Sequence, residues 1–168
     1  MRPSLERIKQ RKQLVGAEIG VQNGYNAMDM LEHLDLLKLY LIDPYTPFPN
    51  ASNGKMPDPS EVNQAMCDKV FEEVKKKFEK YNDKIIWIRK YSWDASNDIL
   101  DGELDFVYID GDHRTEILKK DITLYLSKVK IGGLLAGHDF HFDYVRNGVN
   151  QMLSRYETQG DDWWFIRK

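Results

Sequence analysis

The sequence contains only one cysteine, Cys67, so it can form neither an intramolecular disulfide nor a metal cluster held by cysteines alone. It also has no apolar run that approaches the roughly 20 residues of a membrane span. The first residues, MRPSLERIKQRKQ, lack the apolar core of a signal peptide. These absences predict a cytoplasmic protein that does not contact a membrane.

An excess of charge of one sign is also absent. The chain has 24 Lys and Arg residues against 27 Asp and Glu residues, with a net charge of -3. No strong overall field therefore favours nucleic acid. The densest basic run, residues 75–77, alternates with glutamates, which is typical of a solvated helix face. We expect a small-molecule substrate and no nucleic-acid partner, and we leave association into a homo-oligomer open.

The length and hydrophobic content of the chain predict one folded domain. Its 168 residues, 42% of them hydrophobic, are enough for a single sizeable core over residues 1–168. Short β-rich runs alternate with segments of helical period, and no internal repeat is present. The predicted strands are residues 14–21, 38–42, 85–88, 104–109, 134–136 and 163–166, the last at or near a sheet edge. Predicted helices include residues 27–37, 115–127 and 144–156. This order predicts an α/β fold of Rossmann-like type, with a doubly wound, mostly parallel sheet and helices on both faces.

Residues 46–59 interrupt this alternation with four prolines and several asparagine and glycine residues. We predict a surface loop here, of a length typical either of a lid over a binding site or of a disordered segment. Tyr45 and Phe48, near its start, are candidates for contacts with substrate or adenine. Ser60 is the predicted N-cap of the next helix, whose apolar stripe comprises Val62, Met66, Val70, Val74 and Phe78.

Polar residues collect where the predicted strands end. Residues 18–24 follow the first strand, and Asp43 follows the second. Residues 92–94, 110–113 and 138–139 follow the third, fourth and fifth strands. Ligands of open parallel sheets bind outside these strand ends, near the point where strand order reverses. We therefore expect these distant segments to converge on one rim.

The first of these segments reads E-x-G-x-x-x-G, from Glu18 to Gly24, and its glycines allow a tight turn and a close approach to a ligand. Gln22 stands where a dinucleotide-binding motif has its second glycine, and no Gly-Lys-Ser/Thr of a P-loop follows. Asp43, about twenty residues on, offers two oxygens that can hold ribose hydroxyls. Together these residues predict a nucleoside-bearing ligand without a diphosphate.

The segments VGAEIGVQNGYNA, LYLIDPY, LDFVYIDGDHRTEILKKDI and IGGLLAGHDF occur in this order. In them the chain resembles the class I S-adenosylmethionine-dependent methyltransferases grouped as methyltransferase family 24. The resemblance extends from about Val15 to the WWF segment, and IDGDH, KKDI and GGLLAGHD are its most specific parts. It implies S-adenosylmethionine as the cofactor and a minimal class I methyltransferase fold without a cap domain.

The resemblance also implies roles for residues on the rim. The methionine part of the cofactor would lie against residues 18–24, the ribose against Asp43, and the adenine against Ser92 and Trp93. Asp94 would either join the adenine site or serve as a helix N-cap. The full implied cofactor set is Glu18, Gly20, Val21, Gly24, Asp43, Pro44, Ser92, Trp93 and Asp110.

Some relatives, the macrocin and mycinamicin sugar O-methyltransferases, use a divalent metal and a histidine base. Their pattern maps onto Asp110, His138 and Asp139 as metal ligands and implies Asp110, His113 and His138 as the catalytic residues. His138 stands where those enzymes have an acid, so the set departs from an oxygen-only magnesium site and suits manganese, iron or zinc instead. Histidine can take the proton of a hydroxyl near neutral pH. We rank His113 first as the base, His138 second and His141 third.

These residues could also have a purely structural role. Asp110, His113 or Thr115 would also serve as caps of the following helix, and Asp139 as a residue that holds a loop.

The sequence thus predicts methyl transfer from S-adenosylmethionine to the oxygen of a small hydroxylated substrate, a sugar or a glycosylated metabolite, with a histidine base and metal assistance. The alternatives are an N-methyltransferase that acts on a small amine and an inactive scaffold protein that binds S-adenosylmethionine without turnover.

Overall fold

The computed structural model describes residues 1–47 and 63–168. In this part of the chain seven strands form one sheet in the order β3-β2-β1-β4-β5-β7-β6. The strands that pair in parallel are β1 (Leu14–Ile19), β2 (Leu36–Ile42), β3 (Ile85–Ile88), β4 (Leu104–Ile109) and β5 (Val129–Gly137). Strand β7 (Asp162–Ile166) pairs antiparallel with β5, and β6 (Glu157–Gln159) covers its other side. Strand order reverses between β1 and β4, which is where an open sheet forms its binding crevice.

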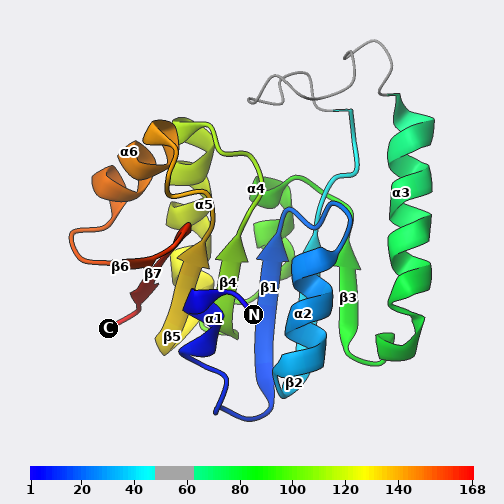
Figure 1. Ribbon diagram of the computed structural model, residues 1–168, viewed down its shortest axis with the longest axis horizontal. Helices are drawn as coiled ribbons and strands as arrows, with labels where there is room; N and C mark the ends of the chain where they lie inside the picture. Colours follow the sequence, from blue (N-terminus) through cyan, green and yellow to red (C-terminus); the bar gives the residue numbers. More distant parts are fainter. Residues whose placement is uncertain (48–62) are drawn as a thin grey trace.

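Helices cover both faces of this sheet, which confirms the predicted Rossmann-like α/β class. One face carries α1 (Pro3–Glu6), α2 (Tyr25–His33) and α3 (Gln64–Lys77). The other carries α4 (Ser92–Ala95), α5 (Thr115–Lys128) and α6 (Asp143–Met152). Figure 1 shows α1 and α2 in front of the sheet and α4 and α5 behind it. Two short 3-10 turns, η1 (Glu79–Tyr81) and η2 (Ser96–Asp98), complete the described elements. No helix among the described residues is both long and apolar enough to cross a membrane.

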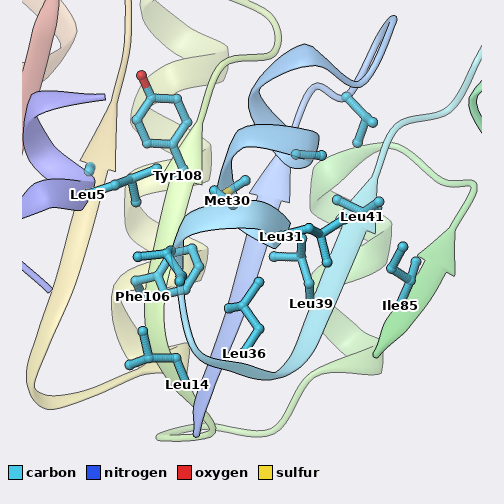
Figure 2. Packing of buried hydrophobic residues seen from close by; sticks show 14 of the residues in the cluster. Leu5, Leu14, Met30, Leu31, Leu36, Leu39, Leu41, Ile85, Phe106 and Tyr108 are labelled. Atoms are coloured by element: carbon cyan, nitrogen blue, oxygen red, sulfur yellow. The ribbon is translucent and has the colours of Figure 1, made fainter. Parts of the chain in front are cut away.

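The core consists of two hydrophobic clusters because successive strand residues point to opposite faces. Phe106 and Tyr108 of β4 pack on the α1–α3 side with Leu5 of α1 and Met30 of α2 (Figure 2). The intervening residue, Val107, packs on the other side, in the cluster that α5 and α6 cover. Both faces of the central strands are therefore buried, and the strand ends form a fixed platform for the polar residues that follow them.

The boundary between α2 and β2 differs from the prediction. The helix ends at His33 rather than at residue 37, and Leu34 is already extended. Leu36 starts β2 and is paired with Leu14 of β1, so its buried position comes from the sheet. The leucines of this region fit a helical period, but pairing with β1 decides the outcome, because sheet burial overrides a short periodic signal.

Two further boundaries were predicted incorrectly. Strand β5 begins at Val129 rather than at residue 134, with Gly132 in a left-handed conformation (φ 78°) where the pairing with β4 is irregular. Helix α6 ends at Met152 rather than at residue 156. Residues 153–156 lead to the edge strand β6, which was not predicted because all its side chains are exposed and lack an apolar pattern.

The predicted loop at residues 46–59 lies largely outside the described residues, as do Phe48 and the predicted N-cap Ser60. Helix α3 begins at Gln64, and Asn63 is its N-cap, with a side-chain oxygen that accepts a hydrogen bond from the Met66 amide at 3.1 Å. This bond satisfies one of the free amides at the start of the helix.

Candidate functional site

The predicted polar segments do converge on one rim at the carboxyl ends of the parallel strands. Backbone hydrogen bonds connect neighbouring strand ends: Gly20 donates to Ile42, and Asp110 donates to Ile19. His138 in turn donates to the carbonyl of Ile109. The residues after β1, β2, β4 and β5 are therefore held next to one another by the sheet itself.

Gly20 allows the closest of these approaches. It has φ 86°, and a Cβ at this position would lie 2.2 Å from the carbonyl oxygen of Asp110. Only glycine fits both the conformation and the space. Gly24 is also left-handed (φ 73°), but a Cβ there would meet Phe78 at 2.7 Å and Val74 at 2.9 Å. Packing against α3 therefore explains Gly24 without a ligand.

Asp43 closes the turn after β1. Its Oδ2 accepts hydrogen bonds from the amides of Val21 (3.0 Å) and Gln22 (2.9 Å), and its Oδ1 accepts one from the amide of Tyr45 (2.8 Å). Gln22 and Tyr45 both have φ 47°, and the Tyr45 hydroxyl donates to the Gln22 carbonyl at 3.1 Å. A carboxylate oxygen can accept more than one hydrogen bond, so Oδ1 keeps capacity for a ligand hydroxyl. Pro44 follows, and its carbonyl accepts from Arg89 at 3.4 Å.

Glu18 is a buried carboxyl group at the end of β1. Its Oε1 accepts a hydrogen bond from Asn26 at 2.8 Å, and its Oε2 has no hydrogen-bond partner among the described residues. Burial raises the pKa of Glu18 to about 8, with Asn26 opposing the shift and the nearby Asp110 and Asp43 adding to it. An unpartnered oxygen in this position is costly unless a ligand donor meets it. Asn26, two residues after the glycine turn, was not among the predicted site residues.

The residues after β3 divide into an anchor and an aromatic surface. The Ser92 hydroxyl is buried and donates to Asp121 of α5 at 2.5 Å, and its carbonyl accepts from Tyr125 at 2.8 Å. Ser92 therefore attaches α4 to α5. Trp93 stacks on Tyr91 with ring centroids 4.7 Å apart, and the Lys120 ammonium lies 4.6 Å from the Trp93 ring. Of the two predicted adenine contacts, Ser92 is buried in this anchor and Trp93 is partly exposed.

Helix capping does not explain the acidic residues of the rim. The N-cap of α4 is Tyr91 rather than Asp94, and the N-cap of α5 is Arg114 rather than Asp110, His113 or Thr115. Neither N-cap residue makes a side-chain capping bond. The capping interpretations are therefore wrong.

Four polar side chains after β4 and β5 form a compact cluster, which we call the rim cluster: Asp110, His113, His138 and Asp139. Asp139 lies between the two imidazoles, with Oδ2 2.9 Å from His113 Nε2 and Oδ1 3.0 Å from His138 Nδ1. Asp110 Oδ1 is 3.7 Å from His138 Nδ1 and 3.9 Å from His113 Nε2. Asp139 has φ 58°, a left-handed conformation that Asp adopts more readily than most residues.

The charges of the rim cluster follow from these contacts. Burial favours the neutral acid of Asp139, but hydrogen bonds from His113 and His138 outweigh burial and hold its pKa well below its usual range. Burial raises the pKa of Asp110, and the neighbouring His138 and His113 oppose that rise. Asp139 is therefore ionised, and an ionised carboxylate only accepts hydrogen bonds. His113 must carry a proton on Nε2, which leaves Nδ1 with the lone pair when the ring is neutral.

Arg2, which the sequence interpretation did not include, reaches the same cluster. Its Nη1 donates to His138 Nε2 at 2.5 Å, and its Nη2 lies 3.7 Å from Asp110 Oδ2. Burial lowers the pKa of His138, whereas the bond to Asp139 and the charge of Asp110 raise it, and the balance lies above its ordinary value. Protonation of Nε2 would nevertheless break the contact with Arg2.

A metal ion would find a different ligand set from the predicted one. Asp110, His113 and Asp139 have ligand atoms that all lie within 4.8 Å of one another. The predicted third ligand, His138, instead has one ring nitrogen on Arg2 and the other on Asp139. The third base candidate, His141, is exposed and pairs with Asp161 at 3.0 Å, apart from the rim cluster.

The sequence and the fold both match known methyltransferases. Residues 17–140 match the profile of methyltransferase family 24, described as a methyltransferase domain. None of the curated proteins compared with the chain matches it in sequence.

Solved structures match nearly the whole chain at low sequence identity. A protein of Clostridium thermocellum, provisionally described as an rRNA methylase, superposes with a TM-score of 0.63 at 13% identity over 98% of this chain and 96% of its own. A protein of Streptococcus mutans, provisionally described as a methyltransferase and solved with S-adenosylhomocysteine, gives 0.61 at 14% identity over 98% and 97%. The N-methyltransferase NodS of Bradyrhizobium japonicum gives 0.59 at 13% identity over 96% and 89%. At such identities these structures show the shared fold alone.

Proposed function

Since this chain belongs to methyltransferase family 24 and is an S-adenosylmethionine-dependent methyltransferase, we propose that it methylates a hydroxyl oxygen of a small molecule, a sugar or a glycosylated metabolite. The observation that carries this proposal is the pairing of His113 with the ionised Asp139 at the rim. In the neutral ring this pairing leaves the lone pair on Nδ1 of His113, a residue that follows β4 at the rim.

The other half of the rim is suited to the cofactor. S-adenosylmethionine supplies a methyl group on a positively charged sulfur. Asp43 has acceptor capacity for the ribose hydroxyls. Trp93 would contact the adenine with the ring face over which the Lys120 side chain now lies, since Tyr91 stacks on the ring as well. The unpartnered Oε2 of Glu18 suits the ammonium of the methionine part, whose positive charge would replace the proton that burial keeps on this carboxyl group. Gly20 lets the backbone approach without a side chain in the way.

The proposed base is His113, acting through Nδ1. An acceptor hydroxyl would give its proton to this nitrogen as the oxygen forms its bond to the methyl carbon, and the bond between that carbon and sulfur breaks to leave S-adenosylhomocysteine. Asp139 fixes the ring through Nε2 and stabilises the imidazolium that results. A positioned base of this kind typically contributes about 10²–10⁴ in rate.

The divalent metal implied by the resemblance does not fit this arrangement as predicted. His138 has no lone pair directed at the rim cluster, because Arg2 occupies Nε2 and Asp139 requires a proton on Nδ1. An ion held by Asp110, His113 and Asp139 would instead take the Nε2 lone pair of His113 and leave the ring proton on Nδ1. His113 can therefore be a ligand or the base, and we propose the base.

The test is transfer of a labelled methyl group from S-adenosylmethionine to a panel of sugars, glycosides and other small alcohols, with small amines as the matched control panel. The proposal expects the label on an oxygen atom of a small molecule. It does not expect a nucleic acid as the acceptor, because the protein carries little net charge. Label on amine nitrogen alone would overturn it in favour of N-methylation. Calorimetric binding of S-adenosylhomocysteine with no transfer to either panel would favour a scaffold that has lost turnover.

A further inference from the structure

The segment before β1 is docked firmly against the sheet. Leu5 and Ile8 are fully buried, and Figure 2 shows Leu5 beside Tyr108 on the face that α1 covers. The amide and hydroxyl of Ser4 donate to Asp162 Oδ2 at 3.1 and 2.6 Å, and the Tyr108 hydroxyl donates to its Oδ1 at 2.9 Å. This buried network attaches α1 to β4 and β7, so the residue just before the helix has a defined position.

That residue is Arg2, which brings a cation into the rim cluster. It precedes α1 in an extended conformation (φ -61°, ψ 139°), and its side chain is 34% exposed. Nη1 donates to His138 Nε2, and Nη2 is 3.7 Å from Asp110 Oδ2. A guanidinium group stays charged at any relevant pH, so this positive charge is permanent.

The contacts of His138 with Arg2 and with Asp139 agree on which ring nitrogen carries the proton. Guanidinium nitrogens only donate, so Nε2 must accept, and the ring hydrogen must be on Nδ1. That hydrogen meets Asp139 Oδ1 at 3.0 Å, while Oδ2 of the same carboxylate meets His113 Nε2 at 2.9 Å. A continuous row of contacts thus leads from Arg2 through His138 and Asp139 to His113.

We propose that Arg2 takes the role of a divalent cation in the rim cluster and is a positioning residue for His113, so that the centre works without a bound metal. The inference rests on the proposed function in one respect, the assignment of His113 as the base. The guanidinium offsets the negative charge of Asp110 and, by keeping Nε2 of His138 as an acceptor, supports the tautomer that donates to Asp139 and holds that carboxylate in place. A metal ion in the same cluster would need lone pairs that these hydrogen bonds use and would be repelled by the guanidinium.

The tautomer is tested by two-bond proton–nitrogen correlation spectra of protein labelled with ¹⁵N-histidine, which contains four histidines. The wild-type spectrum should show His138 protonated on Nδ1. In Arg2→Met the Nε2 resonance of His138 should shift, because this nitrogen loses its hydrogen-bond donor, and the share of rings protonated on Nδ1 alone should fall, because only Asp139 then favours that tautomer. Arg7→Met is the matched control, since Arg7 lies at the other end of α1 and pairs with the exposed Glu157. A wild-type His138 protonated on Nε2, or an unchanged Arg2→Met spectrum, overturns the proposal.

The metal is tested by calorimetric titration with Mn²⁺. Arg2→Met should bind Mn²⁺ at least tenfold more tightly than the wild type, Arg7→Met should match the wild type, and Asp139→Asn added to Arg2→Met should abolish the gain. Wild-type binding as tight as that of Arg2→Met would overturn the proposal. Neither measurement needs an acceptor or turnover, so a failed methyl-transfer assay would refute the proposed function and leave this result standing.

Discussion

The two halves of the rim are built in different ways. The half after β1 and β2 uses backbone amides, glycine and two carboxyl groups, Glu18 and Asp43, all within residues 18–45, and Asp43 closes it with three amide hydrogen bonds. The half after β4 and β5 uses side chains, and it draws Arg2 from the other end of the chain to meet His138. The first half is local in sequence and its shape follows from a few turn residues, whereas the second depends on how distant segments dock.

The largest expected effect lies in the second half. His113→Asn should lower the rate of methyl transfer by about 10²–10⁴ while S-adenosylhomocysteine still binds as in the wild type, because the base is lost and the cofactor half is intact. His141→Asn, which alters an imidazole outside the rim cluster, is the matched control. If His113→Asn lost affinity for S-adenosylhomocysteine by the same factor as it lost rate, the two halves of the rim would not be separable.

Glu18, in the first half of the rim, should make the free energy of unfolding of the protein depend on pH. Its folded-state pKa of about 8 lies above the ordinary 4.5, so the folded protein holds a proton that the unfolded chain releases. Stability is then fully present below about pH 4.5 and is lost as the pH rises toward about 8. Across pH 5 to 7.5 the loss should reach up to about 3 kcal/mol, whereas Glu18→Gln should lack this component. Parallel thermal melts of the two proteins check it, and identical pH dependences would contradict the buried acid.

Gly20→Ala should destabilise the protein by roughly 2–3 kcal/mol, or about 4–12 °C in Tm, because the new Cβ meets the Asp110 carbonyl. Gly160→Ala is the matched control, since Gly160 is also left-handed (φ 60°) but has nothing within 4 Å of its Cβ position. That control should lose only about 1 kcal/mol, from backbone strain. If both variants lost the same free energy of unfolding, the close approach of the turn after β1 to Asp110 would not contribute to stability.

Ser4→Ala should have the smallest effect, about 1 kcal/mol, through loss of its hydroxyl bond to Asp162. Because α1 holds Arg2 in place, the variant should also raise Mn²⁺ affinity, by less than Arg2→Met does. Ser154→Ala, at an exposed serine, should change neither quantity.

The sequence allowed the first half to be predicted more fully than the second. Apolar runs that end in polar residues identified β1, β2 and β4, and the spacing of Glu18, Gly20 and Asp43 identified the turn, because these signals are local. Asn26 and Asp121 were missed because each acquires its role from a single buried contact, with Glu18 and Ser92. Arg2 was missed because its role exists only after α1 has packed on the sheet.

The histidines also show what the sequence could not predict, here at the level of single atoms. The strand ends predicted that His113 and His138 would lie near Asp110 and Asp139, and they do. Spacing along the chain carries no information on which ring nitrogen faces which carboxylate. The sequence therefore predicted His138 as a metal ligand and gave no sign of its contact with Arg2.

A crystal structure of the complex with S-adenosylhomocysteine tests the division of the rim most directly. The account predicts ribose hydroxyls on Asp43, the ammonium at Glu18 Oε2, and Nδ1 of His113 as the imidazole nitrogen that faces the open space beside the sulfur. A ligand bound away from Glu18 and Asp43, or a sulfur that faces His141 rather than His113, would contradict it.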